Sequence, residues 1–300
     1  MPQGLDELLA RSPVVWLDAA TGTELERRGL RAPLPLWTAD AAVRAPAVLR
    51  QVHLDALVAG ADIVTANTFR THPYTLRKAG RAADAAALTL ASVEVAREAC
   101  RLAGRGLVAG SIAPLEDCYH PERVPPPETL RREHALQVRN LTGAGVDLLL
   151  IETMNTGREA HAAAELALES GLPVWVSMVL APDGDGDLLS GEDLEMAFAH
   201  LRKLEAHGRR IGAFLVNCVP LATAHAALAR LHRPEDSRPV GAYPNALRPD
   251  PLAGQVTDGT TPEAFSTWTR AAVELGAGIL GGCCGTGPEH IRAGVAAATS

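Results

Sequence analysis

Short apolar runs recur along the 300-residue chain, and most of them stop at a polar residue. Eight runs stand out, at residues 14–17, 62–66, 107–110, 147–151, 173–179, 212–216, 240–243 and 277–280. Their apolar residues are consecutive instead of alternating with polar ones, which is typical of strands buried on both faces of a parallel sheet. The chain is therefore predicted to contain eight parallel strands.

Helical patterns occupy the segments between these runs. They cover about residues 41–59, 82–103, 128–143, 157–169, 192–205, 221–231, 262–275 and 288–298, after a short leading helix at 5–10. Such strand–helix units in succession fit a (β/α)8 barrel (TIM barrel) best, with an open doubly wound sheet as the alternative. Residues 1–300 are expected to form one domain, because no linker, low-complexity tract or block of charge divides them.

Composition and charge exclude several classes of partner. With 47% hydrophobic and 21% charged residues, the chain can build a large core without disulfides. A formal net charge of -7 and the lack of any Lys/Arg cluster argue against binding to nucleic acid or to an anionic membrane. The N-terminus lacks a basic region followed by an apolar core, and no apolar run approaches the ~18 residues of a membrane span. We expect a cytoplasmic protein, and its composition is compatible with a homo-oligomer.

Polar residues concentrate where the predicted strands end. Because the chemistry of a parallel barrel gathers at the carboxyl ends of its strands, these positions are candidate site residues. They are Asp18, Asn67, Glu152, Cys218, Asn245, Cys283 and Cys284.

The tandem cysteines Cys283 and Cys284 lie between glycines, where the last apolar run ends and the last helical pattern begins. Neighbouring cysteines do not easily form a disulfide with each other, but both can face one metal ion. Thr286 and Glu289 have the spacing of a helix-capping box, with Pro288 in the first turn. The alternative interpretation is a glycine-rich turn that contains two buried cysteines.

Cys218 supplies a third thiol, at the end of the sixth predicted strand. Three thiolates favour Zn²⁺ over harder ions and leave a fourth coordination position open. Such a site can hold a substrate thiol as its thiolate at neutral pH, so the predicted reaction is attack by a substrate sulfur on an electrophilic carbon. No role is expected for Cys100 or Cys118.

Several segments, in chain order, resemble the homocysteine S-methyltransferase family. They are residues 17–25, 60–69, 147–153, 216–218, 243–245 and 281–286, of which the Gly-Gly-Cys-Cys run and its distant Asn-Cys partner are the most specific. The resemblance implies a zinc-bearing (β/α)8 barrel that methylates homocysteine to methionine. It implies that Cys218, Cys283 and Cys284 hold the zinc, and that Asp18 and Glu152 hold the amino end of the substrate. Members commonly have Asp-Gly-Gly or Asp-Gly-Ala where this chain has Asp18-Ala19-Ala20.

Two roles remain as hypotheses. A displaceable fourth zinc ligand is expected from the Asn245 side chain, with Tyr243 as the competing candidate. The simplest methyl donor for a single barrel is a small sulfonium such as S-methylmethionine, and residues 34–37 resemble members that use one. Aromatic faces stabilise such cations, so we expect Trp37 to contact substrate. Asn67, which follows a predicted strand, is also expected to bind substrate. The other aromatic candidates are Phe69, Tyr74 and Tyr119.

Other functions stay open from the sequence alone. Betaine, S-adenosylmethionine or a methyl-carrying protein could serve as donor, and the barrel could be a homocysteine-binding subunit that works with a separate corrinoid protein. Cys283 and Cys284 could also act as a metal-free redox pair in a thiol oxidoreductase. A zinc hydrolase is disfavoured, because none of the ten histidines follows a predicted strand convincingly.

Overall fold

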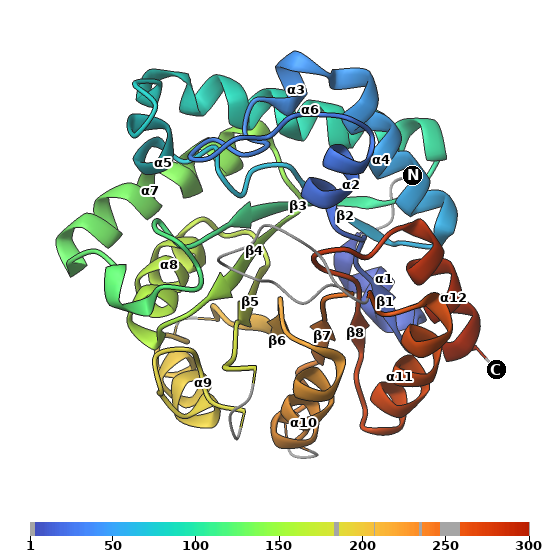
Figure 1. Ribbon diagram of the computed structural model, residues 1–300. Coiled ribbons are helices and arrows are strands. Elements are labelled where there is room, and N and C mark those ends of the chain that lie inside the picture. Colours follow the sequence, from blue (N-terminus) through green and yellow to red (C-terminus); the bar gives the residue numbers. More distant parts are fainter. Residues whose placement is uncertain (1–3, 183–185, 207, 234–235, 247–258, 300) are drawn as a thin grey trace.

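Eight parallel strands form one sheet, in the order β1-β8-β7-β6-β5-β4-β3-β2, with helices around it (Figure 1). The computed structural model describes residues 4–182, 186–206, 208–233, 236–246 and 259–299. The strands are β1 (Val15–Trp16), β2 (Ile63–Ala66), β3 (Leu107–Ile112), β4 (Leu148–Met154), β5 (Val174–Met178), β6 (Ile211–Asn217), β7 (Val240–Tyr243) and β8 (Ile279–Leu280). All eight predicted strands are present.

The two ends of the sheet meet, so the sheet is a barrel and not an open sheet. Leu17 forms a parallel bridge with Ile63. The amide of Asp62 donates to the carbonyl of Trp16 at 2.7 Å, and the Asp62 carboxylate accepts from the Trp16 amide at 3.0 Å. These bonds join β1 to β2, which confirms the predicted (β/α)8 barrel.

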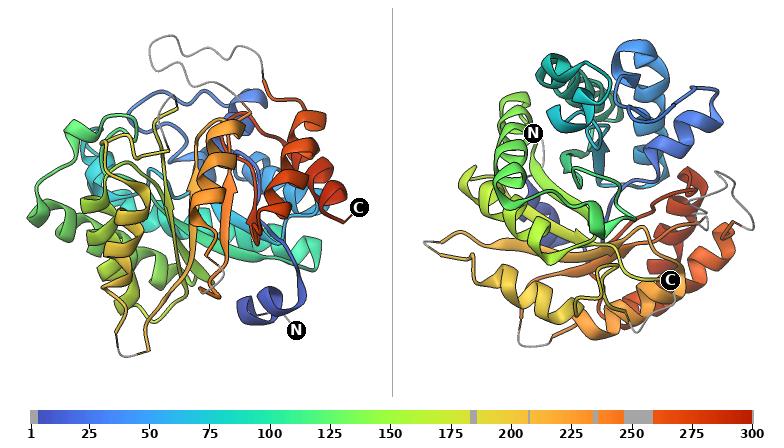
Figure 2. Two further views of the ribbon diagram at one scale, coloured as in Figure 1. Left: turned by 90° about the horizontal axis from the view of Figure 1, so that it is seen from below. Right: turned by 60° about the vertical axis from the view of Figure 1, so that its left-hand side comes forward.

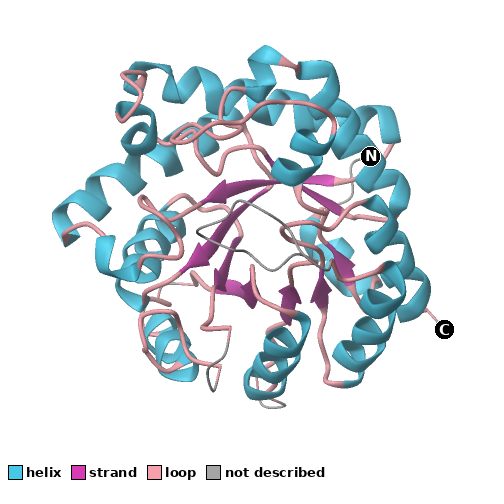
Figure 3. Cartoon of the chain, viewed as in Figure 1, coloured by secondary structure: helices cyan, strands magenta, loops and turns pink. Residues whose placement is uncertain are grey.

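Helices surround the barrel, and most of them form a ring outside the strands (Figure 3). They are α1 (Leu5–Arg11), α2 (Thr21–Arg27), α3 (Ala41–Arg44), α4 (Pro46–Ala59), α5 (Pro73–Arg77), α6 (Ala85–Ala103), α7 (Pro127–Ala144), α8 (Gly157–Glu169), α9 (Leu194–Arg202), α10 (Leu221–Leu231), α11 (Pro262–Glu274) and α12 (Pro288–Ala298), with short 3₁₀ turns at Ala82–Asp84 and Pro121–Arg123. Among the described helices, none is both long and apolar enough to cross a membrane.

The single helix predicted at residues 41–59 is wrong, because the chain divides it into α3 and α4. Ala45 separates the two, with φ -147° and ψ 55°, and Pro46 opens α4. Proline disfavours the helical conformation in the residue before it and cannot donate the next helical hydrogen bond. Sequence periodicity also missed the short helices α2 and α5.

Buried side chains form one layer inside the barrel and another between strands and helices. The inner layer includes Trp175, Leu148 and Leu215, together with Leu5 and Leu8 of α1. α1 lies at one end of the barrel (Figure 2). Because its leucines pack with residues from the strand starts, such as Leu148, the carboxyl ends of the strands are left for a site.

β4 extends further than the predicted strand at 147–151, since it includes Glu152 and ends at Met154. Its register with β5 shifts between Ile151 and Met154. Glu152 is therefore a strand residue next to this irregularity, and its side chain is buried.

Replacing Gly241 by alanine should destabilise the barrel. A Cβ atom at Gly241 would lie 2.0 Å from the backbone oxygen of Ile279, so β7 and β8 would have to separate. Backbone overpacking of this kind costs about 3 kcal/mol of unfolding free energy. Urea denaturation followed by circular dichroism measures it.

Gly143→Ala is the matched control. Gly143 lies in α7, where an added Cβ meets nothing within 4 Å. Alanine in a helix should raise the unfolding free energy by about 0.5–1 kcal/mol. Equal stability of the two variants would contradict the importance of close contact between β7 and β8.

Candidate active site

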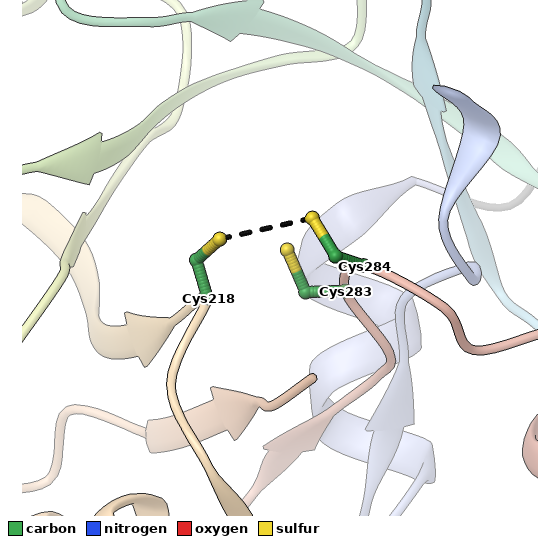
Figure 4. Close-up of side chains that lie close together, drawn as sticks. All are labelled: Cys218, Cys283 and Cys284. Atoms are coloured by element: carbon green, nitrogen blue, oxygen red, sulfur yellow. Dashed lines mark hydrogen bonds between the residues drawn. The ribbon is translucent and has the colours of Figure 1, made fainter. Parts of the chain in front are cut away.

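Three thiols from two nonadjacent strands converge at the carboxyl end of the barrel. Cys218 follows β6, and Cys283 and Cys284 follow β8. The three sulfur atoms all lie within 4.8 Å of one another. Figure 4 shows the side chains pointing toward one another, with the sulfurs of Cys218 and Cys284 3.8 Å apart. The structure thus brings together the three cysteines that the sequence singled out.

The loop after β7 holds the two cysteine-bearing loops in place. The amide of Asn245 donates to the carbonyl of Val219 at 2.8 Å, and the amide of Cys283 donates to the carbonyl of Pro244 at 2.8 Å. The amide of Ala246 donates to the carbonyl of Cys284 at 2.9 Å. These backbone hydrogen bonds therefore hold the two cysteine-bearing loops in place relative to one another.

The glycine-rich loop uses Thr286 differently from the prediction. The predicted capping box of Thr286 and Glu289 is wrong, because Gly287 is the N-cap of α12 and its amide donates to the His290 ring at 3.1 Å. The Thr286 hydroxyl instead donates to the carbonyl of Cys283 at 2.7 Å. Gly282 makes this contact sterically feasible, since a Cβ there would lie 2.2 Å from the hydroxyl oxygen.

The thiol cluster carries an uneven distribution of charge. Hydrogen bonds from the thiols of Cys283 and Cys284 hold the pKa of Cys218 well below its usual range. The same bonds to Cys218 raise the pKa of Cys283 and of Cys284 well above their usual range. Tyr119 adds a hydroxyl 2.9 Å from the Cys218 sulfur. Cys218 is therefore the thiol of the group whose ionisation its neighbours favour most.

Asn245 lies beside this cluster with its amide group unsatisfied. Its side chain is buried, and among the described residues neither its oxygen nor its nitrogen has a hydrogen-bond partner. It nevertheless helps to lower the pKa of Cys218. A buried amide without partners is costly, so this amide beside Cys218 fits the predicted role of a displaceable fourth ligand to a metal ion. The competing candidate, Tyr243, instead directs its hydroxyl to the Glu152 carboxylate at 3.3 Å.

Two buried carboxylates lie in the same cavity. Asp18 accepts from the amide of Thr65 at 2.8 Å and from its hydroxyl at 3.0 Å. Glu152 accepts from the hydroxyls of Ser111 and Tyr243. Burial raises the pKa of Glu152 to about 7, against the lowering effect of the Ser111 bond, and the charge of Asp18 raises it further. The pair thus forms a strongly acidic region that favours a cationic ligand.

An aromatic wall, formed by Trp37 and Phe69, faces the same cavity. The rings meet edge to face with centroids 6.3 Å apart. Asn67 donates to the carbonyl of Thr38 at 2.6 Å and accepts from its hydroxyl at 2.9 Å, so its amide supports the loop that carries Trp37. Tyr74 lies elsewhere, packed near a cluster that includes Leu115.

All the predicted site residues except Asn245 line one cavity of about 460 Å³. Cys118, for which no role was expected, also lines it. Residues that the sequence analysis missed are Thr65, Ser111 and Arg70, as well as Asn217, which bonds Thr153 of β4. Thr65 and Ser111 could have been found as polar residues within otherwise apolar strands.

Strained backbone marks the same place. Among the described residues other than glycine, three have φ in the left-handed region: Trp37 (48°), Thr153 (60°) and Cys218 (58°). All three line the cavity. Such conformations cost free energy and persist where the surrounding structure enforces them, which is characteristic of functional sites.

Fold and site together define a class of protein: a (β/α)8 barrel whose strand ends carry a three-thiol cluster beside an acidic, aromatic cavity. The chain belongs to the homocysteine S-methyltransferase family, whose model matches residues 15–298. As a member of that family, it is an S-methyltransferase.

Individual relatives cover nearly the whole chain. The homocysteine S-methyltransferase of Escherichia coli is 32% identical over 309 residues, with 96% of each chain covered. YbgG, a homocysteine S-methyltransferase of Bacillus subtilis, is 31% identical and covers 96% of this chain and 95% of its own. A selenocysteine methyltransferase of Astragalus bisulcatus is 30% identical, covering 90% of this chain and 88% of its own.

Solved structures agree in fold. The metallated form of the Escherichia coli homocysteine methyltransferase MmuM superposes with a TM-score of 0.82 at 31% identity. The match covers 97% of this chain and 99% of the MmuM chain.

Proposed function

We propose that this chain transfers a methyl group from a small sulfonium, such as S-methylmethionine, to the thiol of homocysteine, with residues 1–300 acting as one domain. The observation that carries the proposal is the meeting of three thiols with two buried carboxylates in one cavity. A reducing compartment such as the cytoplasm would keep these thiols free.

Cys218, Cys283 and Cys284 would hold a zinc ion, with the Asn245 side chain as the ligand that substrate displaces. When bound, the ion supplies a soft Lewis acid that keeps a substrate thiol deprotonated at neutral pH. Asn217 supports the cluster, because its side-chain nitrogen lies 3.9 Å from the Cys283 sulfur and bonds the Thr153 hydroxyl at 2.8 Å.

Asp18 and Glu152 orient the acceptor. Homocysteine carries an ammonium group, and two carboxylates that repel each other gain from a cation between them. Thr65 and Ser111 hold these carboxylates by hydrogen bonds. With the ammonium fixed there, the substrate thiol can extend toward the thiol cluster.

The aromatic wall of Trp37 and Phe69 orients the donor. A sulfonium next to aromatic faces is stabilised by about 0.5–2 kcal/mol. In the transfer, the homocysteine sulfur forms a bond to the methyl carbon while the donor carbon–sulfur bond breaks. Its electron pair stays on the donor sulfur, which becomes a neutral thioether, and the thiol proton goes to solvent.

The zinc proposal predicts a selective effect of Cys218→Ser. Wild-type protein should bind about one Zn²⁺ per chain. Loss of a residue that only supports a metal ligand lowers metal affinity by roughly 10- to 100-fold, and loss of the ligand Cys218 should lower zinc affinity by more than that. Competition with a chromogenic chelator measures both. Cys100→Ser, on α6, is the control and should bind zinc as the wild type does. Unchanged affinity in Cys218→Ser would reject the ligand set.

A donor screen tests the function. Purified zinc-loaded protein is incubated with homocysteine and one of S-methylmethionine, betaine or S-adenosylmethionine, and methionine is quantified. With S-methylmethionine we expect two methionines for each homocysteine consumed, because acceptor and donor both become methionine. Turnover only after a corrinoid protein is added would favour the subunit alternative. Full activity of metal-free protein would favour the oxidoreductase.

The raised pKa of Glu152 leads us to expect that acceptor binding depends on pH. Because burial raises its pKa to about 7, the carboxylate takes up a proton as the pH falls through that value. A protonated Glu152 cannot pair with an ammonium, so kcat/KM for homocysteine should fall as the pH falls below about 7, by up to ~10-fold per unit. Steady-state kinetics between pH 5.5 and 8.5 measure it.

Glu152→Gln should lower kcat/KM at pH 8 and remove the fall in kcat/KM at acidic pH, the acid limb of the pH profile. Glu26→Gln is the matched control, since Glu26 lines the same cavity but bonds the Trp37 indole at 3.0 Å. It should keep the limb. An unchanged limb in Glu152→Gln would assign the titration to another group.

A further inference from the structure

Arg70 has no anionic partner among the described residues, and the other charged residues that line its cavity are all acidic. Among the described residues that line the cavity, it is the only basic side chain, whereas Asp18, Glu26, Asp117 and Glu152 are all acidic. The side chain is partly buried, and its Nε atom is buried without a hydrogen-bond partner in the described structure. The other described arginines that form no ion pair are all exposed.

The position of Arg70 assigns it to the aromatic wall. Its guanidinium carbon lies 5.8 Å from the centroid of the Phe69 ring, and that ring contacts Trp37. Arg70 therefore lies on the side of the cavity that contains Phe69, and it forms no ion pair with the described residues Asp18 and Glu152.

A guanidinium whose buried Nε–H has no partner in the described structure suits a planar anion. Arginine offers paired donors that match a carboxylate, and the Nε–H is one of them. The acidic pair, Asp18 and Glu152, suits the ammonium of one amino acid. The Arg70 guanidinium, which has the opposite charge, suits the carboxylate of a second ligand.

We propose that Arg70 binds the carboxylate of the methyl donor and thereby selects donors that carry one. This inference rests on the proposed function and narrows its donor class. The sulfonium would lie along the Trp37–Phe69 wall while its carboxylate pairs with Arg70. Donor and acceptor would then be held by separate charged groups at separate places.

The test compares two donors that differ only in the carboxylate. S-methylmethionine is one, and (3-aminopropyl)dimethylsulfonium, its decarboxylated analogue, is the other. For S-methylmethionine, Arg70→Gln should raise the donor KM by about 10- to 100-fold, the range expected for a charged hydrogen-bonded pair. The KM for homocysteine and the kinetics with the analogue should change by less than about 2-fold.

Two further variants sharpen the result. Arg70→Lys keeps the charge without the paired donors and should fall between wild type and Arg70→Gln. Arg139→Gln, on an exposed position of α7, should behave as wild type. If Arg70→Gln raised the KM equally for both donors, or raised only the KM for homocysteine, the assignment would be overturned.

Equilibrium dialysis separates this inference from the proposed function. Wild type that binds S-methylmethionine more tightly than Arg70→Gln supports the inference even if no methionine forms, in which case only the proposed reaction fails. Wild type that turns over both donors equally well overturns the inference and leaves the proposed function intact.

Discussion

The convergence of three sulfur atoms is the constraint on which the rest of the site depends. Buried thiols cannot all ionise beside one another, and here Cys218 has a lowered pKa while Cys283 and Cys284 have raised ones. The surrounding protein therefore favours ionisation of Cys218 and disfavours ionisation of the other two thiols. Three thiolates require a cation to offset their repulsion. The backbone bonds of the β7 loop hold the sulfurs close enough for one cation to serve all three.

Strained residues position the groups around this cluster. Left-handed conformations at Trp37, Thr153 and Cys218 each cost about 1–3 kcal/mol. Local bonds offset part of that cost. Asn217 accepts from the Thr153 amide at 3.0 Å, and the Cys218 amide donates to the carbonyl of Tyr243 at 3.3 Å. Because Asn217 also accepts from Ser177 at 2.7 Å, it joins β4, β5 and β6 beside the cysteines. For Thr153 and Cys218, strain and compensation are therefore concentrated at the carboxyl ends of β4 and β6.

Features with local signals were predictable, and features with distant partners were not. Consecutive apolar runs indicated all eight strands, and strand-end cysteines indicated the cluster, because parallel strands bring their carboxyl ends together. The role of Thr286 depends on the Cys283 carbonyl and on the amide of Ala20, which lies 266 residues away in sequence. Tyr74 follows an aromatic pattern, yet tertiary packing directs it away from the cavity. No local sequence pattern distinguishes Arg70. Its distinguishing feature is tertiary, because it lines the cavity and has no anionic partner among the described residues.

The cavity is electrostatically incomplete without ligands, and this property can explain its affinity for them. Ionising Glu152 beside Asp18 in a buried place costs free energy, as its pKa of about 7 indicates. In the proposed function, an ammonium group between the carboxylates would remove that cost, and part of the substrate's binding energy would be relief of a penalty already present in the folded protein. The same reasoning applies to the Nε–H of Arg70 and to the side-chain amide of Asn245, neither of which has a hydrogen-bond partner in the described part of the chain. Each group is unfavourable in isolation, and each becomes favourable only with a ligand of the complementary charge or donor type.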